Sequence, residues 1–248
     1  MHTNFDEKML LARIGDLERG AEHGGKPCFS RFLDPKEIAV FNKQPLPKTP
    51  FMLWGGYEDS ERKILGFFPD YLEPDPALFP IRALRITSRE PLGHRTVLGS
   101  VMGLGIERNL IGDVAMETQG AVLFACDSIC DYIKLNLTKA GRAGIKIQEA
   151  LPESLELLPK AWEPICGTVA SLRLDCVLGL LTGASRNGAE EMLKQERVLL
   201  NHTLCKKSAT LVNTGDVLSV RGFGRAELLE IGGETRKGRM KITLKKYI

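Results

Sequence analysis

The spacing of apolar residues predicts an N-terminal α/β region over residues 1–76. An amphipathic helix is expected over residues 5–21, because apolar side chains recur there at helical intervals: Leu10, Ile14 and Leu17. A second helix is expected to start after Asp34, whose carboxylate can cap it, and to end by Asn42, because three prolines follow. The apolar runs 51–54 and 63–68 predict two strands on either side of a polar loop.

Residues 77–152 predict a second domain with the element order β-α-β-β-α-β. IRALRIT and AGIKIQE have the pattern of its outer strands, GDVAMET and GAVLFAC that of its middle strands, and Asp127 is placed to cap its second helix. This order is the ferredoxin-like or RRM-like arrangement. RRM domains bind RNA with aromatic residues on two central strands, and only Phe124 is available here. Contact with RNA through charge therefore fits this domain better than base stacking does.

Residues 153–168 are predicted to be a linker. Three prolines and a glycine within residues 151–167 are typical of a connection between domains. Trp162 lies in this stretch and can dock the linker against a neighbouring domain.

Residues 169–248 predict a C-terminal domain of two short helices followed by strands. The first helix is expected over residues 172–181, and the second begins after Ser185, which can cap it. Arg173 and Arg186 then stand at the starts of two consecutive helices. There the helix dipole favours anions, and a guanidinium can hold a phosphate with two hydrogen bonds. Strands are expected at 198–200, 218–221, 226–231 and 239–244.

A glycine-flanked turn adds a second feature suited to RNA. In residues 221–225, Phe223 lies between two glycines and two arginines, which suits stacking on a base beside two phosphate contacts. Phe223 can also fold back onto its hairpin, and both placements stay open. The RNA-binding residues predicted for the domain are Arg173, Ser185, Arg186, Lys194, Arg197, Asn201, Lys206, Lys207, Arg221, Phe223 and Arg225.

The distribution of charge points to the same end of the chain. The net charge of the 248 residues is +3, but residues 168–248 hold 14 Lys and Arg against 8 Asp and Glu. Residues 1–167 hold 20 against 23. Such asymmetry favours a nucleic acid or an acidic surface over a small neutral substrate.

Motifs of catalysis, metal binding and membrane insertion are missing from the sequence. The six cysteines form no CxxC pair and no zinc-spaced cluster with histidine, so we expect reduced structural thiols and no metal or cofactor. Gly103 and Gly105 lack the third glycine of a nucleotide loop and fit a helix C-cap better. No signal peptide and no apolar run of about 18 residues is found. We therefore expect a cytoplasmic protein that is not an enzyme and is a monomer when free.

Four stretches of the C-terminal domain resemble the S-four RNA-binding domain, named after a small-subunit ribosomal protein: RLDCVL, ASRNGAEEML, VLLN and VNTGDVLSV. The resemblance implies an α-L motif in which two helices and the following strands form the RNA surface. The matching positions are Arg173, Asp175, Ser185, Arg186, Ala189, Val198, Asn201, Gly215 and Asp216.

Three positions depart from the S-four pattern. Glu196 and His202 stand where the family usually has glycine, and Ser208 stands where it usually has proline. Glu196 matters most, because it places an acid near the implied RNA surface and removes a residue that easily adopts a positive φ. RNA affinity weaker than that of a typical member is therefore expected.

Longer stretches resemble the bacterial YlmH-type proteins: WGGYEDSERKILGFFPDYLEP, LGHRTVLGSVMGLGIERNLIGDV and DYIKLNLTKAGRAGIKIQE. Together with the S-four stretches they cover roughly residues 25–248. The resemblance implies an α+β protein in which an N-terminal α/β region and an RRM-like domain precede the S-four domain. It also implies binding to the large ribosomal subunit through rRNA and tRNA, and a part in ribosome-associated quality control of stalled nascent chains.

Three functions follow as alternatives. The first is a non-catalytic RNA-binding adaptor on the ribosome. The second is an RNA-modifying enzyme, because S-four modules often accompany pseudouridine synthases or methyltransferases. Arg173-Leu174-Asp175 imitates part of a pseudouridine synthase motif, but Leu178-Gly179 stand where that motif needs Thr-Ser. The third is a scaffold protein of cell division, which the sequence leaves open.

Overall fold

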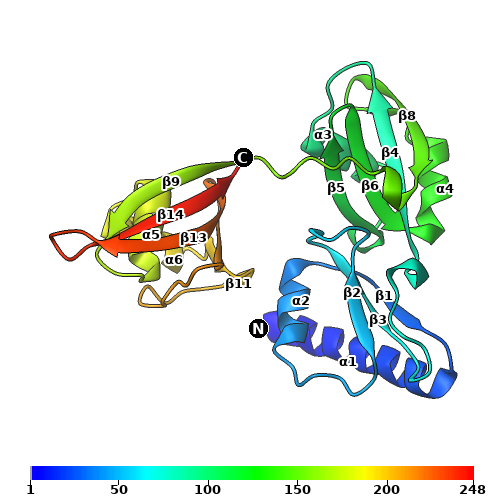
Figure 1. The fold of residues 1–248 in the computed structure, drawn as a ribbon, viewed down its shortest axis with the longest axis horizontal. Coiled ribbons are helices and arrows are strands. Elements are labelled where there is room, and N and C mark those ends of the chain that lie inside the picture. The colour runs from blue at the N-terminus through cyan, green and yellow to red at the C-terminus, as the bar shows by residue number, and fades with distance from the viewer. Residues whose placement is uncertain (1) are drawn as a thin grey trace. The chain divides into compact units, whose positions relative to one another are not determined.

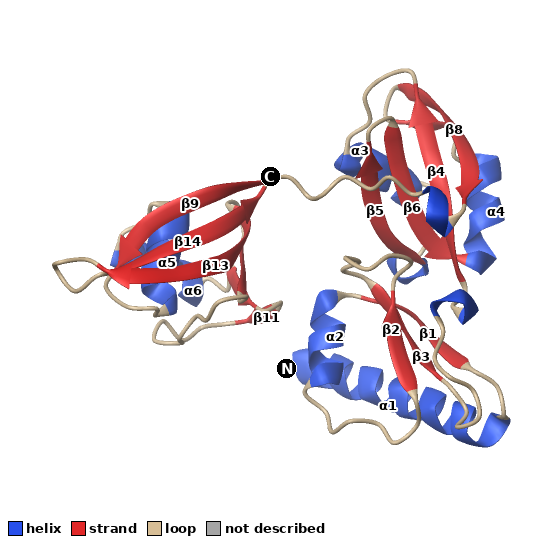
Figure 2. Cartoon of the chain, viewed as in Figure 1, coloured by secondary structure: helices blue, strands red, loops and turns tan. Residues whose placement is uncertain are grey.

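A computed structural model describes residues 2–248, and the chain divides into two compact units, Met1–Leu158 and Pro159–Ile248. The α-helices of the described residues are α1 (His2–Gly24), α2 (Pro35–Asn42), α3 (His94–Met102), α4 (Asp127–Asn136), α5 (Leu174–Thr182) and α6 (Arg186–Lys194). Three sheets accompany them (Figures 1 and 2). The predicted mixture of helices and sheets is therefore confirmed.

The N-terminal part of the first unit is a three-stranded antiparallel sheet with α1 and α2 beside it (Figure 1). The strand order is β1 (Cys28–Leu33), β3 (Lys63–Phe67), β2 (Phe51–Trp54). As predicted, α2 starts after Asp34, which accepts from the Glu37 backbone N–H at 2.9 Å while the Glu37 carboxylate accepts from the Asp34 N–H at 2.7 Å. Strand β1 was not predicted. Its last two residues, Phe32 and Leu33, directly precede the Asp34 cap, so the sequence pattern assigns them to the start of the helix.

The middle part of the first unit has the order β-α-β-β-α-β-β, which is the expected order with one two-residue strand, β7, added before the last. The sheet runs β5 (Ile111–Glu117), β6 (Gly120–Cys126), β4 (Ile81–Ser88), β8 (Ala143–Ala150), β7 (Lys139–Ala140), and all its pairs are antiparallel. Helices α3 and α4 pack on one face. One detail is wrong: the N-cap of α4 is Cys126, so Asp127 lies in the first turn, where its charge still suits the helix dipole.

The face of this sheet opposite α3 and α4 is covered by other segments of the first unit. Tyr57, from the loop between β2 and β3, stacks on Phe124 with ring centroids 4.9 Å apart, and Phe124 is 1% exposed. The loop is fixed by Asp113, which accepts from the Tyr57 hydroxyl at 3.1 Å and from the Glu61 backbone N–H at 2.6 Å. Leu155 and Leu157, after the last strand, pack against the same cluster. Phe124 is therefore unavailable for base stacking.

The second unit is a six-stranded antiparallel sheet with α5 and α6 against one face (Figure 1). Its strand order is β11 (Thr203–Leu204), β10 (Val198–Leu200), β12 (Val217–Val220), β13 (Gly224–Glu234), β14 (Met240–Tyr247), β9 (Trp162–Val169). The core lies between helices and sheet and is formed chiefly by leucine and valine.

Strand β9 corrects the predicted linker. Residues 162–168, assigned to the linker over 153–168, pair with β14 along its whole length. Pro164 is tolerated because β9 is an edge strand. At Gly167 the Leu180 side chain of α5 packs directly over the strand, so a larger residue there would require Leu180 to move. The proline and the glycine that indicated a linker thus belong to a strand.

Candidate nucleic-acid interface

The starts of α5 and α6 are joined by one buried carboxylate. The Asp175 side chain is 0% exposed and accepts from Arg173 Nε at 3.1 Å and Arg173 Nη2 at 2.9 Å. It also accepts from the Cys176 backbone N–H at 3.0 Å, and Arg186 Nε lies 3.4 Å from it. Arg173 lowers the pKa of Asp175 below its usual value, so the carboxylate is charged at neutral pH. We call Arg173, Asp175 and Arg186 the helix-start site.

The two arginines of this site are not equivalent. Arg173 is 33% exposed and gives Nε and Nη2 to Asp175, whereas Arg186 is 69% exposed and approaches Asp175 with Nε alone. Both Nη groups of Arg186 remain for a bidentate contact with a phosphate. Ser185, as predicted, caps α6 by accepting from the Gly188 N–H at 3.2 Å. Of the two arginines, Arg186 is therefore the more accessible to a phosphate.

The first N–H groups of α5 already have partners in the loop before β12. The Leu174 N–H donates to Thr210 O at 2.8 Å, and the Asp175 N–H donates to Ser208 O at 3.2 Å. These two N–H groups are therefore not available to an anion, and the groups at this end that could hold a phosphate are the guanidinium groups.

Arg239 is a residue of this region that the sequence analysis missed. It lies with Asp175 and Arg186 in the lining of one concavity, and its guanidinium donates to Thr168 Oγ1 at 3.1 Å and Thr168 O at 2.6 Å. The sequence did not indicate Arg239, because this residue lies between β13 and β14, far along the chain from α6, which ends at Lys194. Its proximity depends on the pairing of β14 with β9.

A second group of predicted residues lies beyond the other end of α6, about 12 Å along the helix axis. Arg197 Nη2 donates to Arg221 O at 2.8 Å, and the Arg221 N–H donates to Arg197 O at 2.9 Å, which fixes the turn over residues 221–225. Phe223, at the tip of this turn, is 37% exposed. Lys194 at the end of α6 and Lys207 in the following loop are also exposed. Residues predicted to bind RNA thus lie at both ends of α6.

Glu196 adopts the backbone conformation that favours glycine. Its φ is +57°, and it follows α6 in a Schellman arrangement: its N–H donates to Leu193 O at 3.2 Å and the Arg197 N–H donates to Met192 O at 3.1 Å. Its carboxylate pairs with Lys206 Nζ at 2.5 Å, which lowers the pKa of Glu196. The positive φ of Glu196 therefore strains the end of α6. Its carboxylate also pairs with Lys206, one of the residues predicted to bind RNA.

Glu196→Gly is expected to stabilise the second unit by about 1 kcal/mol, because glycine reaches a positive φ without strain. It is also expected to strengthen RNA binding, since Lys206 is released and an acid is removed. Urea unfolding and RNA titration of the purified chain measure the two effects. Glu196→Gln is the matched control, because it removes the charge and keeps the strain. Equal stability of the parent and the glycine variant would contradict the role given to the backbone.

Two residues predicted to bind RNA, Asn201 and Arg225, make contacts inside the second unit. Asn201 donates through Nδ2 to Asp216 Oδ1 at 2.7 Å and accepts from the Val217 N–H at 2.9 Å, so its amide holds the β10–β11 turn. Arg225 lies on the sheet face opposite the helices, with Cζ 4.4 Å from the centroid of the Tyr247 ring. Both side chains therefore have partners within the second unit.

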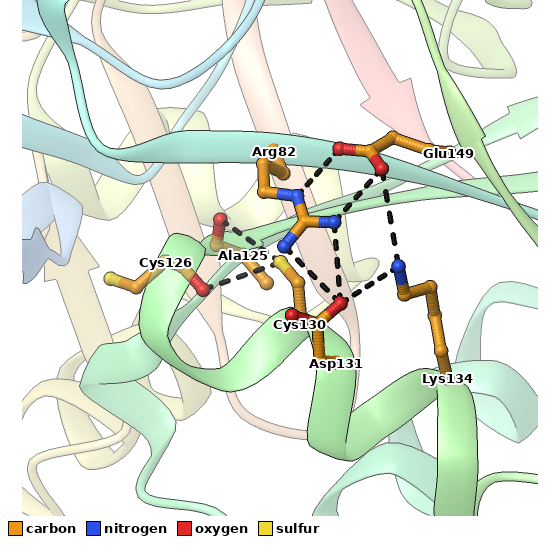
Figure 3. Close-up of polar contacts among 7 residues, drawn as sticks. All are labelled: Arg82, Ala125, Cys126, Cys130, Asp131, Lys134 and Glu149. Carbon is orange, nitrogen blue, oxygen red and sulfur yellow. Dashed lines mark hydrogen bonds and ion pairs between the residues drawn. The ribbon is translucent and has the colours of Figure 1, made fainter.

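Figure 3 shows how cations of the middle domain are neutralised. Arg82 donates to Glu149 at 2.6 and 2.8 Å and lies 3.3 Å from Asp131, which also pairs with Lys134 at 2.7 Å. Next to this network, Cys130 Sγ donates to Cys126 O at 3.3 Å. Burial raises the pKa of Cys126 to about 11 and that of Cys130 to about 12, so both thiols are protonated and structural.

Within residues 2–248, no group of three or more His, Cys, Asp or Glu side chains is arranged to hold a metal ion. The same residues include no helix with the length and apolar composition needed to cross a bilayer.

Comparison with known proteins identifies relatives of both the middle domain and the whole chain. Residues 79–153 match the family described as "Putative RNA-binding domain in YlmH". The chain is 28% identical over 249 residues to the "Ribosome-associated protein quality control protein P2" of Bacillus subtilis (strain 168), covering 99% of this chain and 97% of that protein. The chain is thus similar to a YlmH-type protein over nearly its whole length, and its middle domain matches the YlmH family model.

A solved structure supports the fold. The "Cell division protein ylmH from Streptococcus pneumoniae" superposes with a TM-score of 0.50 at 22% identity, over 59% of this chain and 92% of that one. The family match lies in the first unit, whereas the helix-start site lies in the second. The two units therefore carry separate candidates for contact with RNA.

Proposed function

We propose that the chain is a non-catalytic RNA-binding adaptor that acts on the ribosome in the cytoplasm. The observation that carries this proposal is the helix-start site, in which one buried carboxylate aligns two arginines and leaves Arg186 69% exposed. A buried anion that organises exposed cations suits a fixed phosphate site, because the guanidinium is held in place before the RNA arrives.

The proposed architecture has four parts: an N-terminal α/β region (1–76), an RRM-like domain (77–152), a connection, and an S-four-type RNA-binding domain over residues 169–248 whose sheet also includes β9. With the two-residue strand β7 left out, the strands of the middle sheet counted within that domain have the order 4-1-3-2, which supports the RRM-like assignment. Two consecutive helices with arginines at their starts, followed by strands, support the S-four-type assignment.

The name of the Bacillus subtilis relative supports ribosome-associated quality control as the setting. We propose rRNA of the large subunit, together with tRNA, as the RNA that is bound, and a monomer as the free form. The buried thiols of Cys126 and Cys130 are protonated, so neither is suited to act as a nucleophile.

The proposal is tested by recovering the full chain from a lysate free of ribonuclease activity and sequencing the RNA that accompanies it. Enrichment of large-subunit rRNA is the expected result. Recovery of no RNA would favour the scaffold alternative. Binding of S-adenosylmethionine, or a lost rRNA modification in a deletion strain, would favour the enzyme alternative.

A further inference from the structure

The middle domain cannot bind RNA through the sheet face that RRM domains use. Phe124 is 1% exposed beneath Tyr57, and Leu155 and Leu157 pack on the same face. Any contact between RNA and residues 79–153 must therefore come from another surface of the domain.

The Lys and Arg side chains of residues 79–153 fall into two classes. Four of them are engaged within the protein: Arg82 and Lys134 in the network of Figure 3, Arg85 with Glu117 at 2.7 Å, and Arg108 with Ile111 O at 2.6 Å and Gly112 O at 3.0 Å. The other five are exposed, and within residues 2–248 their side chains have no hydrogen bond or ion pair: Arg89, Arg95, Lys139, Arg142 and Lys146.

These five residues lie at one end of the domain. The Gly141 N–H donates to Ser100 Oγ at 3.0 Å, and Gly141 also lies against the Thr96 side chain. The β7–β8 hairpin, with Lys139 and Arg142, therefore packs beside the first turns of α3, where Arg95 is located.

The end of β4 reaches the same place. Ser88 Oγ donates to Gly144 O at 3.0 Å, so Arg89 follows directly beside the hairpin. Lys146 is the register partner of Thr87 on β4. We call the five cations the basic end.

Few opposing charges and no aromatic side chains accompany the basic end. Within residues 88–95 and 139–146 the only carboxylate is Glu90, and there is no Phe, Tyr or Trp. Nearby Glu117 is bound to Arg85 and accepts from the Glu156 N–H at 3.0 Å. The surface can therefore attract phosphates but offers no ring for a base.

We infer that the basic end is a second RNA site of this chain, which binds the phosphate backbone of folded RNA without reading its sequence. The inference rests on the proposal that the chain binds ribosomal RNA. It adds a contact surface in the first unit, separate from the helix-start site in the second.

The test compares charge-reversed variants of the full chain binding to large ribosomal subunits across a salt series. Lys139→Glu with Arg142→Glu removes two phosphate contacts. This should lower the slope of log affinity against log salt by about 1.4–1.8 and weaken binding at least about tenfold near 0.15 M salt. Arg95→Glu with Lys146→Glu should act in the same way. Lys43→Glu with Lys48→Glu makes an equal change of charge at exposed positions outside residues 79–153 and is the matched control.

Unchanged affinity and slope in both test pairs, with the thermal unfolding midpoint retained, would overturn the inference. If Arg186→Glu still weakens binding in that case, the proposed function stands without the second site. A loss of affinity for intact subunits but not for protein-free large-subunit rRNA would assign the basic end to an acidic protein, and would also overturn the inference.

Discussion

Arg173→Ala is expected to lower the free energy of unfolding of the second unit by about 2 kcal/mol. Asp175 is fully buried, and Arg173 supplies two of its hydrogen bonds, at 2.9 and 3.1 Å. Without Arg173 the carboxylate keeps the Cys176 N–H and the more distant Arg186. Because Arg173 is one-third exposed, water replaces part of the loss, so the effect stays below that of a wholly buried pair.

Urea unfolding of the full chain in a Trp54→Phe background measures this effect, since Trp162 is then the only tryptophan and lies in the second unit. Adding Asp175→Asn to Arg173→Ala should recover most of the lost stability, because no buried charge remains. Arg186→Ala is the control and should change stability by less than about 0.5 kcal/mol, as its side chain is largely exposed. A loss below that value for Arg173→Ala would contradict the structural role given to Arg173.

The effect of Arg173 on stability should depend on pH with a definite sign. Arg173 holds the pKa of Asp175 below its usual value. The stabilisation is therefore complete above the pKa of an unfolded aspartate, about 3.9, and is lost as the pH falls through the lower folded pKa. The difference between the parent and Arg173→Ala should thus be constant near neutral pH and shrink below about pH 4.

Arg186→Glu is expected to weaken the binding of ribosomal RNA by about tenfold to a hundredfold, with little loss of stability. Both Nη groups of Arg186 are free of Asp175, and the side chain is 69% exposed. Loss of one phosphate contact should also reduce the salt slope by about 0.7–0.9. Titration of labelled rRNA at several salt concentrations measures both quantities.

Lys48→Glu is the matched control for this prediction. Lys48 is also basic and exposed, but it lies in the loop between α2 and β2 of the first unit, whereas α5 and α6 belong to the second. The two variants carry the same charge, so a specific phosphate site predicts a much larger loss for Arg186→Glu. Equal losses would indicate attraction by net charge alone.

Local chemistry made several features of the fold and site predictable from the sequence. Asp34 and Ser185 cap their helices because short polar side chains reach the first free N–H groups. Arg186 stands at the start of α6 because the cap fixes where that helix begins. Glu196 has a positive φ, which agrees with the glycine that the S-four pattern usually has at this position.

Features that depend on distant pairing could not be predicted in this way. Strand β9 is stable because β14, about 75 residues later, pairs with it. Asp175 is buried between residues of two helices, and nothing in its local sequence distinguishes it from a first-turn carboxylate exposed to water. Phe124 is covered by Tyr57, which precedes it by 67 positions, so the closed sheet face could be seen only in the folded unit.

Crosslinking of RNA to the full chain bound to large ribosomal subunits, with the linked peptides sequenced, tests the central claim most directly. We predict that rRNA links to peptides of the second unit along α6, at its start near Arg186 and in the turn that carries Phe223. Links that avoid residues 173–225, from a chain that still binds the subunit, would contradict the claim that this surface holds the RNA.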